Sequence, residues 1–144
     1  MSDNLLLAAL PRSERQRLES FLELVDLPNG EMLIEPNSKI TNMYFPIDCV
    51  TSTIQELSDG SSVEVGLMGV EGFIGVQFWL HSDQTPTRTV VQVSGRSYRM
   101  GAEVFRREVM QKDSPFNALC ARYTHGFLVM TSQTAVCNCP VFFQ

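Results

Sequence analysis

A succession of short β-rich runs, each ended by a turn, constrains the fold of this chain more than any other feature of its sequence. The clearest turn is Ser58-Asp59-Gly60-Ser61, because Asp-Gly supplies the positive φ angles of a two-residue hairpin between strands at 50–57 and 62–68. Further runs of the same kind raise the expected number of strands to at least seven; they are 32–34, 43–45, 76–80, 87–93 and 97–100. Regular spacing with frequent turns favours a rolled antiparallel barrel.

Helical patterns flank these strands. Ser13-Glu14-Arg15-Gln16 has the form of a capping box, and it predicts a short amphipathic helix with apolar residues at helical spacing as far as Val25. A second helix is expected over 102–111. After a break at Asp113-Ser114-Pro115, the pattern predicts the longest helix of the chain, from about 116 to 137.

One apolar stripe follows the predicted long helix. Its members are Phe116, Leu119, Tyr123, Phe127 and Met130, at steps of three or four residues. Two interpretations stay open: the stripe packs on the barrel of its own chain, or it forms a seam with a second copy of the helix. Because so much apolar surface rarely stays exposed, we predict a homodimer through this helix.

Charge and composition exclude several classes of protein. The 144 residues carry a net charge of −5, whereas a domain that binds nucleic acid on its own usually carries a basic face. Direct DNA binding is therefore not expected. The sequence shows neither a cleavable leader nor an apolar run of the roughly 18 residues that a membrane span needs. We expect one soluble cytoplasmic domain whose four cysteines are reduced.

Catalytic and metal-binding motifs do not occur in the sequence. His81 and His125 lie outside any metal-ligand spacing, and Cys137-Asn138-Cys139 is too tight for a zinc knuckle and has no second pair. P-loop, Rossmann and Gly-x-Ser-x-Gly patterns are missing as well. A cupin-like metalloenzyme would need two or three inward ligands, and the barrel has one histidine. The chain is therefore predicted to be a binding module and not an enzyme, without a metal site.

A glycine-rich segment ends just before the predicted strand at 76–80. From Gly66 to Gly75 glycine recurs at every third position, and Arg88-Thr89 follows after a loop. Backbone N–H groups that converge in such a segment can hold an anion, and a nearby arginine can add charge-assisted bonds to a phosphate. The alternative is a glycine-rich bulge between barrel strands with Arg88 exposed.

The order of these features resembles the sensor half of the Crp/Fnr family of bacterial transcription regulators, whose β-roll is a cyclic nucleotide-binding fold. The resemblance covers residues 4–138. Its motifs are Leu5-Leu6-Leu7-Ala8-Ala9-Leu10-Pro11 with Glu14-Arg15, Met43-Tyr44-Phe45-Pro46, Asp59-Gly60, Val65-Gly66, Glu71-Gly72-Phe73-Ile74-Gly75, Val91-Gln92-Val93-Ser94-Gly95, Arg122-Tyr123 and Ala135-Val136-Cys137-Asn138. It implies a mainly β chain with flanking helices: an antiparallel β-roll, or jelly roll, followed by a long dimerisation helix.

The resemblance also implies ligand-binding positions. Nucleotide-binding members hold the ribose with a glutamate after a glycine turn, and hold the cyclic phosphate with an arginine followed by serine or threonine. Gly75 and Val76 stand at the glycine and glutamate positions, Arg88 and Thr89 at the phosphate pair. Thr131-Ser132 fall where the cyclic-AMP-responsive member contacts the base. The implied ligand is a small anion, with a cyclic nucleotide as the candidate, and no other cofactor is implied.

Val76 is the main departure from the pattern of nucleotide-binding members. A ribose hydroxyl that loses its carboxylate acceptor keeps its desolvation cost, a penalty on the order of 1–3 kcal/mol. Tight binding of cyclic AMP is therefore not expected. The loop before Arg88 is also slightly longer than in those members. An oxygen-sensing iron–sulfur cluster is not expected either, since no cysteine precedes Cys49.

The end of the sequence leaves the family pattern. Cys139-Pro140-Val141-Phe142-Phe143-Gln144 stands where members continue toward a winged helix-turn-helix domain. We therefore expect a sensor domain over 1–138, with its long helix from about 116, and an atypical truncated tail over 139–144 without a DNA-binding domain. The predicted function is regulatory ligand sensing of the Crp/Fnr type. The alternative is a ligand-free dimerisation or interaction scaffold.

Overall fold

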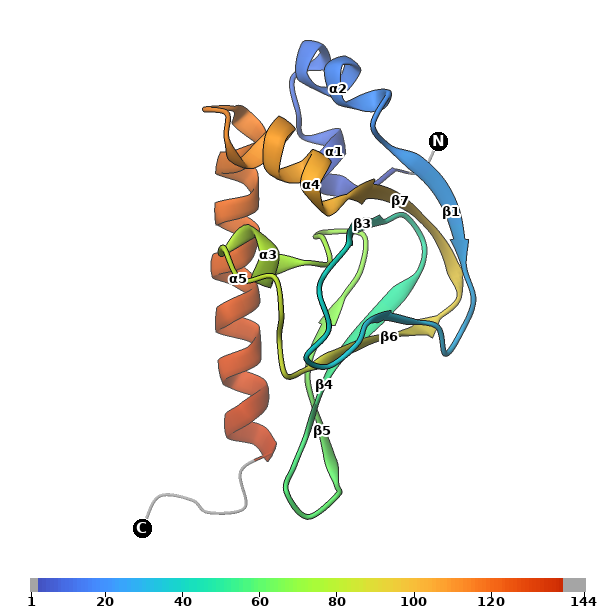
Figure 1. Cartoon of the computed structure of the whole chain (residues 1–144), viewed down its shortest axis with the longest axis vertical. Coiled ribbons are helices and arrows are strands. Elements are labelled where there is room, and N and C mark those ends of the chain that lie inside the picture. Colours follow the sequence, from blue (N-terminus) through green and yellow to red (C-terminus); the bar gives the residue numbers. More distant parts are fainter. Residues whose placement is uncertain (1–2, 139–144) are drawn as a thin grey trace.

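The strands form two antiparallel sheets that curl into a roll (Figure 1). The computed structural model describes residues 3–138, without the side chains of 131 and 134–138. Within this range one sheet has the strand order β1-β7-β3 and the other the order β2-β6-β4-β5. The strands are β1 Glu23–Leu27, β2 Met32–Ile34, β3 Asn42–Pro46, β4 Val50–Glu56, β5 Ser62–Met68, β6 Arg88–Val93 and β7 Gly95–Gly101.

The helices cover one end and one side of the roll. They are α1 Leu5–Ala8, α2 Arg12–Glu19, α3 Val76–Trp79, α4 Ala102–Phe105, the π-helix η1 Arg106–Met110 and α5 Pro115–Asn138. Helices α1, α2 and α4 lie together at the upper end in Figure 1, and α5 runs along the side of the roll. None of the helices between residues 3 and 138 is long and apolar enough to cross a membrane.

The β4–β5 hairpin forms at the predicted turn, but the two-residue loop expected there was wrong, because the loop spans residues 57–61 and only Gly60 of the Asp-Gly pair has a positive φ. Gly60 adopts a φ of +90°, which glycine reaches without strain. The carboxylate of Asp59 accepts hydrogen bonds from the backbone N–H of Ser61 at 2.9 Å and from its hydroxyl at 2.6 Å. These bonds stabilise the turn locally.

Two predictions near the N-terminus were wrong. Helix α2 begins at Arg12 after Pro11, with no side-chain cap, so the predicted capping box does not form. The helix also ends at Glu19, and residues 23–27 form β1, which pairs along its whole length with β7. Long-range pairing there outweighs the local helical spacing, because helix propensity is a weak preference that tertiary contacts override.

Two further segments differ from the sequence prediction. Residues 76–79, expected to be a strand, form the short helix α3 because Gly75 reverses the chain direction just before it. The single helix expected over 102–111 is divided into α4 and the π-helix η1. A stretch of π-helix is rare in proteins and is frequent at functional sites.

A cluster of aromatic rings fixes the helices to the roll. Phe45 of β3 packs against Phe73, Phe105 and Phe116 with ring centroids 5.7–6.3 Å apart. All four side chains are fully buried. Because they come from β3, the glycine-rich segment, α4 and α5, this cluster holds the start of α5 against the interior of the roll.

Candidate functional site

The glycine-rich segment ends in a left-handed turn at Gly75. Its φ is +115°, and a Cβ at this position would lie 2.5 Å from the sulfur of Met43. Only glycine fits such a turn without strain. The turn starts α3 and directs the side chain of Val76, which is 5% exposed, into the roll. Gly75 thus forms the turn before α3, and the apolar side chain of Val76 fills space inside the roll.

Thr89 faces the same interior from β6. Its side chain is 2% exposed, and its Oγ1 lies 3.3 Å from Oγ1 of Thr53 on β4. The cavity between these groups measures only about 10 Å³; its lining is Thr53, Met68, Phe73, Ile74, Gly75, Val76, Gln77, Thr89 and Phe127. Pockets that hold small molecules usually measure roughly 300–1,000 Å³. The roll is therefore closed and would have to open to admit a nucleotide.

Arg88 is not brought into this cavity. Successive side chains of a strand point to opposite faces, so Arg88 and its neighbour Thr89 diverge. The guanidinium of Arg88 forms an ion pair with Glu56 at the end of β4. The structure therefore separates the two members of the expected phosphate pair.

Thr131 and Ser132 lie toward the end of α5. Ser132 is exposed, so its side chain does not enter the roll in this structure. The side chain of Thr131 lies outside the described part of the chain, and the contact predicted for it lies there too.

The apolar stripe of α5 packs on the roll of its own chain, as in the first of the two interpretations that the sequence leaves open. Phe116 is fully buried and Phe127 is 9% exposed. The ring of Tyr123 lies 5.4 Å from Phe73 and 6.1 Å from Phe127. Leu119, Tyr123 and Met130 are half-buried against the same core. The first interpretation of the stripe thus describes its contacts within one chain, and the homodimer through α5 stays a prediction.

A groove that the sequence did not predict lies between α1, β5 and α5. Its volume is about 470 Å³; it is lined by Leu6, Leu67, Glu71, Leu119, Arg122, Tyr123, Gly126, Phe127 and Met130. Phe127 also lines the closed cavity and so separates the two spaces. The apolar stripe of α5 predicts one wall of this groove, but the sequence does not show that Leu6, Leu67 and Glu71 lie opposite it, because they come from segments far apart in the chain.

The groove contains two hydrogen-bond donors without partners. The hydroxyl of Tyr123 is buried and has no partner among the described residues. Burial, and to a lesser extent the charge of Glu71, raises the pKa of Tyr123 above its ordinary value, so the phenol stays protonated. Arg122 is exposed and makes no hydrogen bond or ion pair with any side chain or backbone group that the structure describes. The carboxylate of Glu71 instead accepts a hydrogen bond from the N–H of Gly69 at 3.3 Å.

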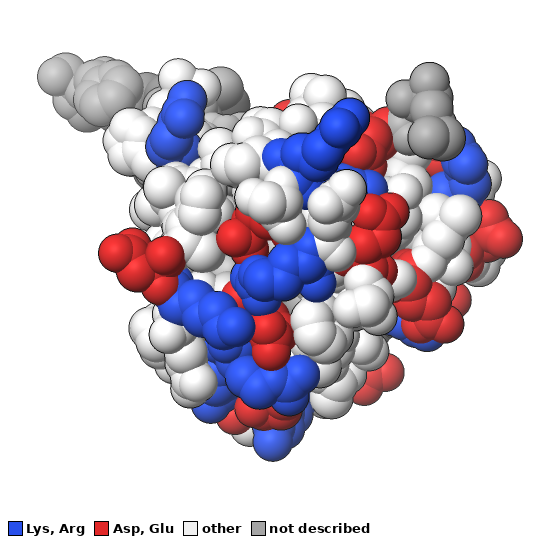
Figure 2. Space-filling model, turned by 90° about the horizontal axis from the view of Figure 1, so that it is seen from above, with Lys and Arg blue, Asp and Glu red and all other residues white. Residues whose placement is uncertain are grey.

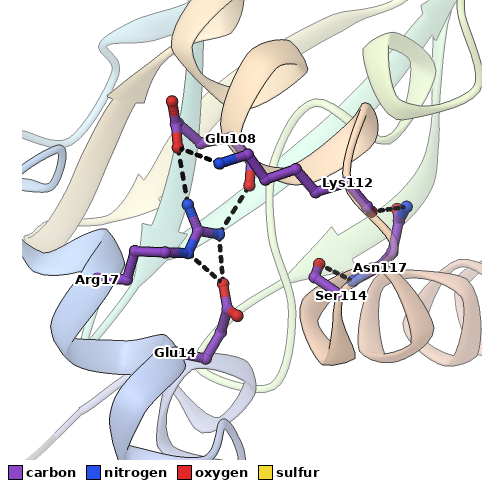
Figure 3. Close-up of polar contacts among 6 residues, drawn as sticks. All are labelled: Glu14, Arg17, Glu108, Lys112, Ser114 and Asn117. Atoms are coloured by element: carbon purple, nitrogen blue, oxygen red, sulfur yellow. Dashed lines mark hydrogen bonds and ion pairs between the residues drawn. The ribbon is translucent and has the colours of Figure 1, made fainter.

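A chain of polar contacts joins α2 to the π-helix (Figure 3). Arg17 donates to a carboxylate oxygen of Glu108 at 2.7 Å and to its backbone carbonyl at 2.8 Å, and it also binds Glu14. Lys112 donates to the same carboxylate at 3.2 Å. Hydrogen bonds from Arg107 and then Lys112 lower the pKa of Glu108. The π-helix is thus held from α2 and from the turn that precedes α5.

Asn117 extends these contacts to α3. Its Oδ1 accepts a hydrogen bond from the indole N–H of Trp79 at 2.8 Å, and its Nδ2 donates to the carbonyl of Lys112 at 3.3 Å. Its backbone N–H donates to the hydroxyl of Ser114 (Figure 3). Gly75 directly precedes α3, and Trp79 ends it. The bond between Trp79 and Asn117 therefore connects the segment at the closed cavity with the first turn of α5.

On the face that Figure 2 shows, basic and acidic side chains are mixed. Figure 2 looks onto the end that carries α2 and α4, where basic and acidic side chains lie beside one another. Among the residues that the structure describes, no group of three or more His, Cys, Asp and Glu side chains could hold a metal ion.

Comparison with known proteins identifies the fold. No protein-family model matches the chain, and no curated protein sequence matches it significantly. The c-di-GMP-responsive global regulator CLP from Xanthomonas campestris is similar with a TM-score of 0.72 and 14% identity, over 89% of this chain and 65% of that chain. The sensor domain of the transcriptional regulator DNR from Pseudomonas aeruginosa has a TM-score of 0.62 and 12% identity, over 96% and 90%.

A third similar structure comes from another kind of regulator. The regulatory subunit of a cAMP-independent protein kinase A from Trypanosoma brucei has a TM-score of 0.72 and 14% identity, over 90% of this chain and 47% of that chain. The chain thus spans about half of the kinase subunit and nearly all of the DNR sensor domain. These likenesses confirm the predicted fold: an antiparallel cyclic nucleotide-binding jelly roll with flanking helices and a C-terminal helix.

Proposed function

We propose that the chain is a regulatory, non-enzymatic ligand-sensing domain of a cytoplasmic Crp/Fnr-type transcription regulator, with α5 as its output. The fold shared with the CLP and DNR regulators supports this function. The observation that carries it is the hydrogen bond between Trp79 and Asn117, which connects the Gly75 loop to α5. Direct DNA binding by this chain is not proposed, because its net charge is −5.

The ligand of this proposal is a small anion that enters the roll at Gly75, Val76 and Thr89, and a cyclic nucleotide is the candidate. An inward hydroxyl on Thr89 and the left-handed turn at Gly75 support this position. Binding requires two movements: the cavity of about 10 Å³ must open, and Arg88 must leave Glu56. Thr131 and Ser132 of α5 would complete the site in the open state.

A closed free state has a consequence for affinity. A ligand that binds only the open form has an apparent affinity reduced by the fraction of molecules that are open. Sensing is then a shift of the population from closed to open, biased by the contacts that the ligand makes in the open form alone. We therefore expect weak binding of cyclic nucleotides, in agreement with the loss of the ribose acceptor at Val76.

The second part of the proposal is a homodimer through α5. Its exposed residues Ala118, Ala121, His125 and Leu128 recur at steps of three, four and three, the spacing of a coiled-coil seam. Leu128 and the adjacent Val129 are 52% and 46% exposed. Ala118 and Ala121 are small and allow close approach of a second helix. We therefore propose this exposed face, and not the stripe that packs on the roll, as the dimer interface.

The alternative function, a ligand-free dimerisation scaffold, is favoured by one specific observation. Val76 is buried and takes part in closing the cavity, so the roll is a well-packed core without a ligand. In that case α5 would still pair with a second copy, and no small anion would change its position.

Calorimetric titration with cyclic AMP and cyclic GMP separates the two functions. The wild-type chain should bind at least one of them weakly. Glu56→Gln should strengthen binding up to about fivefold, because it releases Arg88 from an exposed ion pair worth roughly 0.2–1 kcal/mol. Arg88→Gln should abolish detectable binding.

Glu23→Gln is the matched control, since it releases Arg99 from a similar ion pair between β1 and β7, away from the cavity. This variant should bind like the wild type. If neither the wild type nor Glu56→Gln releases heat with either nucleotide, cyclic nucleotide sensing is rejected and the scaffold function is favoured.

A further inference from the structure

Gly126 has a position that the packing of its own chain does not require. It lies in the middle of α5, where glycine disfavours a helix relative to alanine. No described atom lies within 4 Å of a Cβ built at this position. A larger residue would therefore fit without a clash, and the missing side chain widens the groove between α1, β5 and α5.

The groove has the dimensions and the lining of a small-molecule site. Its volume of about 470 Å³ falls within the usual range of roughly 300–1,000 Å³. Leu6, Leu67, Leu119 and Met130 give it apolar walls. Buried polar groups in proteins nearly always have a hydrogen-bond partner, so the unpartnered hydroxyl of Tyr123 marks a place where an acceptor would be stabilised.

The unused polar groups define the chemistry of the occupant. The Tyr123 hydroxyl and the Arg122 guanidinium are both donors, and the carboxylate of Glu71 already accepts from Gly69. Two hydrogen-bond donors beside apolar side chains are complementary to a ligand that has an anionic acceptor group and is otherwise apolar. We propose that this groove is a second ligand site, which binds a small apolar monocarboxylate through Arg122 and Tyr123.

A second copy of the chain is a less suitable occupant. Successive residues of an α-helix are about 100° apart, so Ala118, Ala121 and His125 lie on a different flank of α5 from Leu119, Tyr123 and Gly126. The proposed dimer seam and the groove can therefore be occupied at the same time. The groove is also independent of the nucleotide site, since its only lining residue in common with the closed cavity is Phe127.

The test uses the full chain and octanoate, with octan-1-ol and octylammonium as neutral and cationic analogues. Titration followed by two-dimensional NMR should show saturable shifts for residues 67–72 and 119–130 with octanoate. Octan-1-ol should bind at least about fivefold more weakly, and octylammonium should not bind, because each loses the charge-assisted bond to Arg122. Arg122→Gln should reduce the preference for octanoate over octan-1-ol to about onefold.

Gly126→Leu fills the groove and should abolish octanoate binding, whereas Gly126→Ala is the matched control and should retain it within about threefold. Both variants favour the helix, so a loss confined to Gly126→Leu is not a folding defect. Equal binding of octanoate by wild type and Gly126→Leu would overturn the proposal. So would unchanged NMR spectra together with dissociation of a dimer by Gly126→Leu, which would make a second copy the occupant. Titration with cyclic AMP measures binding in the roll and not in the groove. Its result therefore does not depend on whether octanoate binds.

Discussion

At the scale of single residues, Gly72 determines how closely α5 approaches the glycine-rich segment. A Cβ at this position would lie 2.0 Å from Cε1 of Tyr123 and 2.6 Å from its hydroxyl oxygen. The phenol ring therefore lies directly on the backbone of Gly72. The carbonyl of the same glycine accepts a hydrogen bond from the buried side chain of Asn4 at 2.8 Å, which joins α1 to the same point. One glycine thus allows α1, α5 and the segment before α3 to meet.

Gly72→Ala should therefore destabilise the domain. The added methyl group must displace the ring of Tyr123, and such overpacking costs about 1–3 kcal/mol of the free energy of unfolding. Gly126→Ala is the control, because its Cβ meets open space; it should leave stability unchanged or raise it by up to about 1 kcal/mol. Urea unfolding measures both. Equal stability of the two variants would contradict the close contact between Gly72 and Tyr123.

At the scale of elements, the sequence predicted correctly those features that depend on residues close together in the chain. Asp59-Gly60 correctly marks the place of the β4–β5 turn, although not the length of its loop, and the break before Pro115 correctly separates α5 from the preceding helix. β1 was missed because its pairing with β7 is a long-range contact that no local spacing contains. The helical start of α3 was missed because a residue pattern does not show which way Gly75 turns the chain.

The candidate site was predicted only in part, for a related reason. Gly75, Val76 and Thr89 line the same small cavity, and their role in ligand binding stays a prediction. The direction of Arg88 depends on strand alternation and on the availability of Glu56, which sits on another strand. The closed state of the cavity depends on side-chain volumes in three dimensions. The stripe of α5 was assigned to a seam because periodicity shows that a helix has an apolar face, but does not show what covers that face.

The contact between α3 and α5 provides a prediction at the same scale. Trp79→Phe keeps an aromatic ring and removes only the N–H that binds Asn117, so it should cost about 0.5–1.5 kcal/mol. Hydrogen exchange should become faster in α3 and in the first turns of α5 together, because each holds the other. Phe78→Leu, a change in the adjacent core that keeps the hydrogen bond, serves as the comparison. Faster exchange in α3 alone would show that the two helices are not coupled.

At the scale of the whole molecule, α5 takes part in every proposed function. One side of the helix packs on the roll and also lines the groove, and the exposed face carries the proposed dimer seam. Phe127 separates the closed cavity from the groove. A ligand in either space would therefore contact α5. A shift of α5 would in turn change the proposed interface with a second copy of the chain.

A charged residue introduced into the proposed seam of α5 tests whether the dimer forms there. Ala121→Glu should dissociate the dimer at tens of micromolar, because it places like charges opposite one another between the two helices. Ala8→Glu adds the same side chain at an exposed position of α1 and should leave the dimer intact. Phe127→Asp is expected to unfold the domain instead, since Phe127 belongs to its core. Sedimentation equilibrium distinguishes these results. A wild-type monomer, or a dimer unaffected by Ala121→Glu, would contradict the proposed seam.

The emission of Trp79 tests the central proposal, that a ligand in the roll changes the position of α5. Trp79 is the only tryptophan of the chain, and its indole N–H forms the contact with Asn117. Titration with cyclic AMP should change its emission in a saturable way, with the same midpoint as the heat of binding. Glu56→Gln should shift both midpoints to lower concentration. Heat of binding without any change in emission would contradict transmission to α5, and the absence of both signals up to millimolar nucleotide would contradict cyclic AMP sensing itself.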